Sequence, residues 1–116
     1  MSNPINIEQI RAKNALSDTG QKAKKEGQEG DSLSGYPSLI INNGLISCVA
    51  YSLDKGKQHE RIADAIAFHL NDRKILSCEK AETLRDRLCE CDSSILQRAT
   101  HEALQFLAYL KRFQKG

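Results

Sequence analysis

Basic side chains are the groups in this sequence whose types and spacing best fit a chemical task. Lysine and arginine that gather on one surface bind the phosphate groups of a nucleic acid without reading its bases. Two clusters are candidates for such contacts, Lys55, Lys57 and Arg61 in mid-chain and Lys111, Arg112 and Lys115 near the C-terminus. The alternative for each cluster is a solvated surface with no ligand. Arg85 and Arg87, with Glu82 and Asp86 beside them, are assigned to that alternative.

Cysteine, histidine and carboxylate residues show no pattern of a metal centre or an active site. Cys89 and Cys91 would point about 200° apart on a helix, and structural zinc sites prefer roughly two to four intervening residues. No Ser- or Cys-containing motif surrounds any of the three histidines, and His69 is expected to be a hydrogen-bonded interior residue. Glu60 and Asp64 resemble a solvated i, i+4 pair. We therefore expect no metal, no cofactor and no catalysis by this chain.

The balance of charges bears on whether the chain binds nucleic acid by itself. There are 17 Lys and Arg against 15 Asp and Glu, which gives a net charge of +2. A protein that binds phosphate alone usually has a larger basic excess, whereas a subunit that shares a nucleic-acid groove with partners needs few contacts. The content of three Tyr, three Phe and no Trp argues against stacking on bases, and Tyr109 is the one candidate on a polar flank.

The length and the apolar content predict a single globular unit. With 116 residues we expect one helical domain over residues 1–116 with one modest core. No apolar run approaches the roughly 18 residues that a membrane span requires. The N-terminal sequence MSNPINIEQI has neither the basic nor the apolar region of a secretory signal. We therefore expect no membrane contact, a cytoplasmic location and reduced cysteines.

The C-terminal segment 94–115 carries the clearest hydrophobic periodicity. Spacings of three and four residues place a broad apolar stripe on one face of a helix, made of Leu96, Ala99, Ala103, Leu104, Phe106, Leu107, Leu110 and Phe113. The opposite, polar face is expected to carry Arg98, Glu102, Gln105 and Arg112. This pattern predicts an amphipathic helix that packs against the rest of the domain.

Capping signals mark a helix at the start of the chain. Asn6 followed three residues later by Gln9 matches a capping box, and the helix is expected to reach about residues 22–25. Gly20 lies inside this span and could end the helix early, because glycine costs about 1 kcal/mol in a helix interior. The following residues 27–35 have loop composition without periodicity. We interpret them as a flexible connection.

Two more helices are predicted between that connection and the C-terminal helix. Segment 58–73 is apolar almost all round, which is typical of a helix at the centre of a core. Ser77 is expected to cap the next helix, which runs to about residue 91. Asp92 or Ser93 then caps the last one. Together these elements predict an all-α fold, a compact bundle of about five helices.

Segment 39–51 admits two interpretations. The dipeptide Asn43-Gly44 lies between two β-prone runs, and this is the strongest short-range signal for a hairpin. Helical spacing instead places five residues on one face, Ile41, Leu45, Cys48, Val49 and Ser52, with Pro37 suited to a first turn. An isolated hairpin among helices is marginal because no third strand is available to join it. The residues alone leave the two interpretations nearly balanced.

Two blocks of the sequence resemble a known protein family. One block reads Ala-Thr-x-Glu-Ala-Leu over 99–104 and Leu-Lys-Arg-Phe over 110–113, and the other spans 36–45 with Pro-Ser-Leu-Ile and Asn-Gly-Leu. In combination they resemble the small-subunit family of the Cmr module, the type III-B CRISPR ribonucleoprotein effector. Arg11-Ala12-x-x-Ala15 is a weaker match, and Tyr109 departs from the tryptophan that is common in the family.

The resemblance implies a fold and a function. It favours a helix over 39–51, with Gly44 explained by the close approach of a neighbouring helix. It implies a non-catalytic subunit that stacks in several copies as a minor filament and contacts the backbone of guide RNA and target RNA. Its partners would be the backbone subunits, other Cmr-type subunits and copies of itself. Two alternatives stay open, the small subunit of a type III-A effector complex and a helical protein–protein adaptor with no RNA role.

Overall fold

Seven α-helices and no strand make up the part of the chain that the computed structural model describes, residues 6–24 and 31–113. They are α1 (Ile7–Ala15), α2 (Asp18–Lys24), α3 (Asp31–Asn43), α4 (Leu45–Lys55), α5 (Lys57–Asp72), α6 (Ala81–Glu90) and α7 (Ser93–Arg112). The predicted all-α class is therefore confirmed, and segment 39–51 is helical rather than a hairpin. The radius of gyration is 13.3 Å, close to the value of about 13 Å that a compact chain of this length has.

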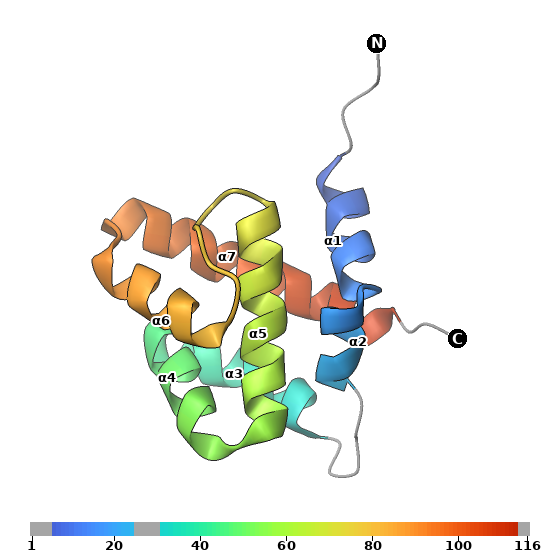
Figure 1. The fold of residues 1–116 in the computed structure, drawn as a ribbon, viewed down its shortest axis with the longest axis horizontal. Helices are drawn as coiled ribbons and strands as arrows, with labels where there is room; N and C mark the ends of the chain where they lie inside the picture. Colours follow the sequence, from blue (N-terminus) through green and yellow to red (C-terminus); the bar gives the residue numbers. More distant parts are fainter. Residues whose placement is uncertain (1–5, 25–30, 114–116) are drawn as a thin grey trace.

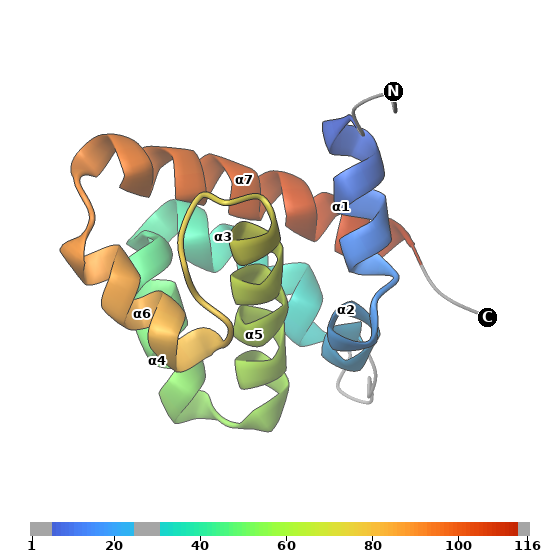
Figure 2. The same ribbon diagram turned by 45° about the horizontal axis from the view of Figure 1, so that its top comes forward.

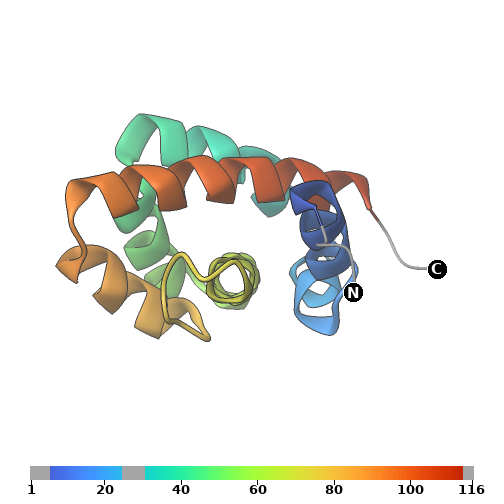
Figure 3. The same ribbon diagram turned by 90° about the horizontal axis from the view of Figure 1, so that it is seen from above.

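Helix α5 lies at the centre of the bundle and contacts each of the other six helices. In Figure 1, α4 and α6 lie on one side of α5, and α1 and α2 lie on the other. Helix α7 runs across the molecule from α6 to α1, as Figure 2 shows. The view along α5 in Figure 3 shows both groups flanking it, with α7 covering one side and α3 beyond α7. This arrangement gives α5 the central position predicted for segment 58–73.

The core consists of the apolar faces that the helical periodicity predicts. Helix α5 contributes Ile62, Ile66 and Leu70, all fully buried, and full burial of such a side chain stabilises the fold by roughly 1.5–3 kcal/mol. Helix α7 contributes buried Ala99, Ala103, Phe106, Leu107 and Leu110, and Leu96, Leu104 and Phe113 pack partly buried against them. The predicted apolar face of segment 94–115 is thus confirmed.

The predicted N-terminal helix is two helices, because the chain breaks at Ser17. The capping box of Asn6 and Gln9 is present and opens α1 as predicted. The Ser17 hydroxyl donates to the Asn14 carbonyl at 2.6 Å and accepts the Gly20 amide at 3.1 Å, so this side chain ends one helix and caps the next. Gly20 does not end a helix. A Cβ atom there would lie 2.5 Å from the carbonyl oxygens of Asn14 and Ala15, so glycine permits the close turn.

A second break, at Gly44, separates α3 from α4 and brings the number of helices from the predicted five to seven. Gly44 has φ 92° and ψ 156°, a conformation that is nearly restricted to glycine. The explanation by close approach of a neighbouring helix is wrong, because a Cβ atom at Gly44 would meet nothing within 4 Å. The backbone conformation is the reason for glycine. Ile41, which the prediction places on the apolar face, is instead 69% exposed.

Helix α3 begins earlier than the loop-like composition of residues 27–35 suggests. Residues 31–35 are helical, while 27–30 lie outside the described residues. Pro37 is therefore inside the helix and not in its first turn. Leu33 packs partly buried against the core. Tertiary packing of this kind overrides a weak local propensity.

Helix α6 begins at Ala81, so the prediction that Ser77 caps it is wrong. The Ala81 amide donates to Asp64 Oδ1 on α5 at 2.7 Å. A carboxylate of α5 thus caps the N-terminus of α6 in place of a residue next to it in sequence. At the next boundary the prediction is confirmed, because Asp92 Oδ1 accepts the Ile95 amide at 3.1 Å and opens α7.

Candidate nucleic-acid interface

The mid-chain basic cluster lies at the corner between α4 and α5. Lys55 is the last residue of α4, Lys57 is the first of α5, and Gly56 joins them with φ 140° and ψ 175°. Both lysines are exposed, and Arg61 follows one turn along α5 as a half-exposed residue. The structure therefore brings the three predicted residues together on one corner of the bundle.

A lysine of α2 completes this cluster. Lys22, Lys57 and Arg61 line a surface hollow of about 430 Å³ together with Glu60 and Asp64. None of the three cations forms an ion pair with another described residue. The site residues predicted from the sequence do not include Lys22, although it belongs to the basic run 22–25. What the sequence could not show is that α2 packs on α5.

Lys24 is not counted with Lys22, Lys57 and Arg61, because its ammonium group is used in contacts within the fold. Its ammonium donates to the carbonyl oxygens of Phe113 at 2.6 Å and of Lys111 at 3.4 Å. A cation at the C-terminal end of a helix is favoured by the helix dipole. Burial lowers the pKa of Lys24 below its ordinary value. Lys24 thus fastens α2 to the end of α7.

The second predicted cluster lies at that end of α7. Lys111 and Arg112 are exposed in its last turn and form no ion pair with another described residue. Lys115 lies outside the described residues. Helix α2 contacts both α5, which carries part of the first cluster, and α7, which carries the second.

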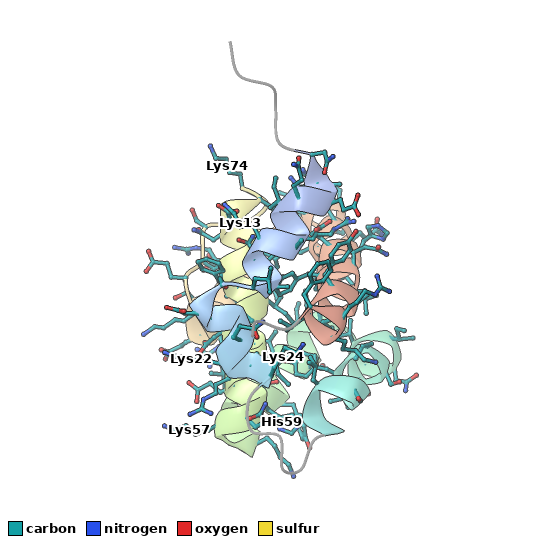
Figure 4. All side chains as sticks on the ribbon, turned by 90° about the vertical axis from the view of Figure 1, so that its right-hand side faces the viewer. Lys13, Lys22, Lys24, Lys57, His59 and Lys74 are labelled. Carbon is teal, nitrogen blue, oxygen red and sulfur yellow. The ribbon has the colours of Figure 1, made fainter. Side chains whose placement is uncertain are left out.

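Exposed lysines extend the basic surface along the α1 and α2 side of the molecule. Figure 4 shows Lys74, Lys13, Lys22 and Lys57 in this order down the face, and we call these four residues the lysine face. Their elements are the turn after α5, α1, α2 and the start of α5. With 16 residues, α5 spans about 24 Å between its ends. This length is sufficient for contacts with several successive phosphates of one strand.

A buried ion pair holds α1 in place beneath the lysine face. Both Arg11 Nε and Nη2 donate to Glu102 of α7 at 2.8 Å, and His69 Nε2 lies 2.8 Å from the same carboxylate. Although burial raises the pKa of Glu102, the hydrogen bonds from Arg11 and His69 and the charge of Arg11 outweigh it and lower that pKa to about 2. The prediction that Glu102 lies on the polar face is wrong, because the residue is only 4% exposed.

His69 joins this ion pair to a second residue of α1. Asn14 Nδ2 lies 2.9 Å from His69 Nδ1 and donates to Asp72 at 3.2 Å. Because an amide nitrogen only donates, His69 accepts at Nδ1 and donates from Nε2 to Glu102. The imidazole is fully buried and stacks on Phe106 at 4.3 Å. The prediction of an interior, hydrogen-bonded histidine is confirmed.

The aromatic residues differ in their availability at the surface. Tyr109, the candidate from the sequence, stacks on Phe113 at 5.7 Å and has the Arg11 guanidinium 5.8 Å from its ring centroid. Tyr51 is instead 45% exposed, beside Lys55. Helical spacing agrees with this exposure, because Tyr51 does not belong to the predicted apolar face of segment 39–51.

The cysteines are dispersed over the structure. All four are free, with Cys48 and Cys78 buried, Cys89 exposed and Cys91 half-buried. Burial raises the pKa of the Cys78 thiol to about 11, which keeps it protonated near neutral pH. In residues 6–24 and 31–113, no three His, Cys, Asp or Glu residues gather as a metal site would require. No described helix is long and apolar enough to cross a membrane.

Comparison of the sequence with protein-family models identifies the family of this chain. The family described as CRISPR-associated protein (Cas_Cmr5) matches residues 7–116. The chain belongs to the Cmr5 family. The predicted resemblance to the Cmr small-subunit family is therefore confirmed, and the match covers every helix described above.

The fold of this Cmr5-family chain also matches a solved structure. The X-ray crystal structure of a CRISPR-associated Cmr5 family protein from Thermus thermophilus superimposes with a TM-score of 0.73, covering 93% of this chain and 94% of that chain. Sequence identity is 21%, so this likeness concerns the fold. No curated protein sequence is matched.

Proposed function

We propose that this protein is the non-catalytic small subunit of a type III-B CRISPR complex that targets RNA under the direction of a guide RNA. Membership of the Cmr5 family is the observation that carries this proposal. In the proposed complex several copies stack as a minor filament beside the backbone subunits. The chain then contacts the backbone of the guide and target RNA and leaves cleavage to its neighbours.

The distribution of charge supports a contact with RNA backbone. The net charge is only +2, yet the lysine face gathers exposed cations on one side of the molecule. Lys22, Lys57 and Arg61 also line one hollow without an ion pair to another described residue. When such cations bind phosphates, the counterions condensed on the nucleic acid are released. This release provides affinity without base readout. A subunit of this kind accepts any guide sequence.

The opposite part of the molecule offers a surface for another subunit. A groove of about 760 Å³ lies where the α3–α4 turn meets α7, and its lining combines apolar side chains such as Leu45 and Leu96 with polar ones, without any Lys, Arg, Asp or Glu. Exposed Ile41 belongs to the same end of α3. A groove without lysine or arginine fits a protein partner better than it fits RNA. This groove is also what the adaptor alternative would use.

Purification of the tagged protein from its native host tests the proposal first. Mass spectrometry of co-purifying proteins and sequencing of bound RNA should recover several effector subunits and short RNAs with a common repeat-derived 5′ end. Recovery of type III-A subunits would replace the type III-B assignment by the type III-A alternative. Recovery of one unrelated protein without RNA would favour the adaptor alternative.

A charge-reversal pair tests the RNA surface. Lys57→Glu should weaken RNA binding and reduce the slope of log affinity against log salt by about 0.7–0.9 for each phosphate that the variant no longer binds. Arg98→Glu is the matched control, because Arg98 is exposed on α7, lies outside both clusters and changes the net charge by the same amount. If both variants weaken binding equally, general charge and not the α4–α5 corner determines affinity.

A further inference from the structure

Tyr51 is an aromatic side chain that the fold leaves at the surface. Among the described residues, two large hydrophobic side chains are exposed to solvent, those of Ile41 (69% exposed) and Tyr51 (45% exposed). Tyr51 lies in the last turn of α4, one turn before Lys55.

The ring is held in place by a row of aromatic contacts. The imidazole of His59 meets Tyr51 edge-on, with centroids 5.6 Å apart and an interplanar angle of 90°. On its other flank His59 lies 6.4 Å from the ring of Tyr36. Tyr36 is fully buried and hydrogen-bonded to Ser52. The exposed ring thus contacts a partly buried imidazole, which in turn lies against a fully buried tyrosine.

A cation lies over the exposed ring, and two more belong to the same corner of the bundle. Lys55 Nζ lies 5.9 Å from the Tyr51 centroid, and Lys57 and Arg61 belong to the same corner. The carboxylates of this corner are Asp54, Glu60 and Asp64, and Asp64 already accepts the Ala81 amide of α6. An aromatic platform flanked by flexible cations matches the chemistry of single-stranded nucleic acid, in which each base has a π-face and each linkage an anionic phosphate.

We propose that Tyr51 stacks on an unpaired base of single-stranded RNA, while Lys55 and Lys57 contact the phosphates on either side of that base. The base takes the ring face over which the Lys55 ammonium lies in the free protein, and the flexible lysine moves to a phosphate. Recognition of this type is independent of base identity. The inference rests on the proposed RNA-binding function and adds a base contact to a surface otherwise limited to phosphates.

Fluorescence provides a direct test, because the chain contains no Trp. Tyr51→Trp introduces a single indole at the proposed platform, and Ala50→Trp places it at the neighbouring exposed position of α4 as a control. Addition of a short oligouridylate should quench and shift the emission of Tyr51→Trp and leave that of Ala50→Trp nearly unchanged. Equal changes in the two variants would overturn the proposal.

Affinity measurements separate stacking from electrostatic binding. Tyr51→Ala should bind oligouridylate about tenfold more weakly than the wild type, within the range for base–aromatic stacking, whereas Tyr51→Phe should bind normally. A strand of the same length without bases should bind the wild type and Tyr51→Ala equally. If Tyr51→Ala binds oligouridylate like the wild type, the stacking inference is wrong and the electrostatic proposal stands. If the wild type binds neither strand, the proposed RNA function itself fails.

Discussion

Replacement of Glu102 by glutamine tests how α1 is attached to the bundle. The substitution keeps the shape of the side chain and removes its charge, so the Arg11 guanidinium, with a side chain only 13% exposed, loses its counterion. The lowering of the Glu102 pKa from 4.5 to about 2 corresponds to about 3 kcal/mol of folding free energy at neutral pH. Loss of one partner of a buried pair has a similar cost, roughly 3–5 kcal/mol.

The same pKa shift fixes the pH range in which the difference between wild type and variant changes. A carboxylate with a lowered pKa contributes its full stability above its ordinary pKa of 4.5 and loses it as the pH falls toward about 2. Between about pH 7 and about pH 3 the wild type should therefore lose about 2 kcal/mol through Glu102. Glu102→Gln has no group to titrate there, so its deficit relative to the wild type should shrink by that amount.

Urea unfolding followed by circular dichroism measures these free energies. Glu90→Gln is the matched control, because the Arg87–Glu90 pair is at the surface with side chains 47% and 67% exposed, and its loss should cost less than about 1 kcal/mol. A deficit of Glu102→Gln that stays constant across the pH range would refute the assignment of the shift to Glu102. A deficit no larger than that of Glu90→Gln would refute the role of the ion pair in stability.

Three further predictions concern the helices that carry the basic surface. Gly44→Ala should lower the free energy of unfolding by about 1–3 kcal/mol, because Gly44 has a glycine-specific backbone conformation. Gly35→Ala, at an open helical position, should raise it by up to about 1 kcal/mol. Denaturant titration should therefore show changes of opposite sign in the free energies of unfolding of the two variants. Asp92→Ala should cost about 1 kcal/mol as a lost helix cap, and thermal unfolding should show Asp92→Asn close to the wild type. Phe106→Ala should cost about 3–5 kcal/mol, since the ring is fully buried against His69, and a decrease below about 1 kcal/mol in urea would contradict this packing.

Local signals in the sequence predicted the features that depend on neighbouring residues. The capping box of Asn6 and Gln9, the cap at Asp92 and the central helix over 58–73 are all present. Each of these depends on residues within a few positions of one another, where spacing and capping chemistry are informative. The family resemblance correctly favoured helix over hairpin in segment 39–51.

The errors share a different physical origin, contacts between residues far apart in the chain. Glu102 stands at a polar position of the α7 pattern and is buried because Arg11, 91 residues away, pairs with it. Ser77 has the right type for a cap, yet Asp64 of α5 supplies the hydrogen bond. For the same reason Lys22 joins the basic corner only through the packing of α2 on α5.

The ion pair between the first helix and the last also affects the order in which parts of the protein fold during synthesis. During synthesis α1 leaves the ribosome early, but the carboxylate that binds Arg11 comes 91 residues later. The Arg11–Glu102 contact of α1 therefore forms only after nearly the whole chain has been made, whereas the contacts of Asn14 with α5 can form earlier. Lys13 lies on this same helix, so the lysine face gains its last support only in a fully made molecule. An interrupted chain that lacks α7 would lack the ion pair beneath this face.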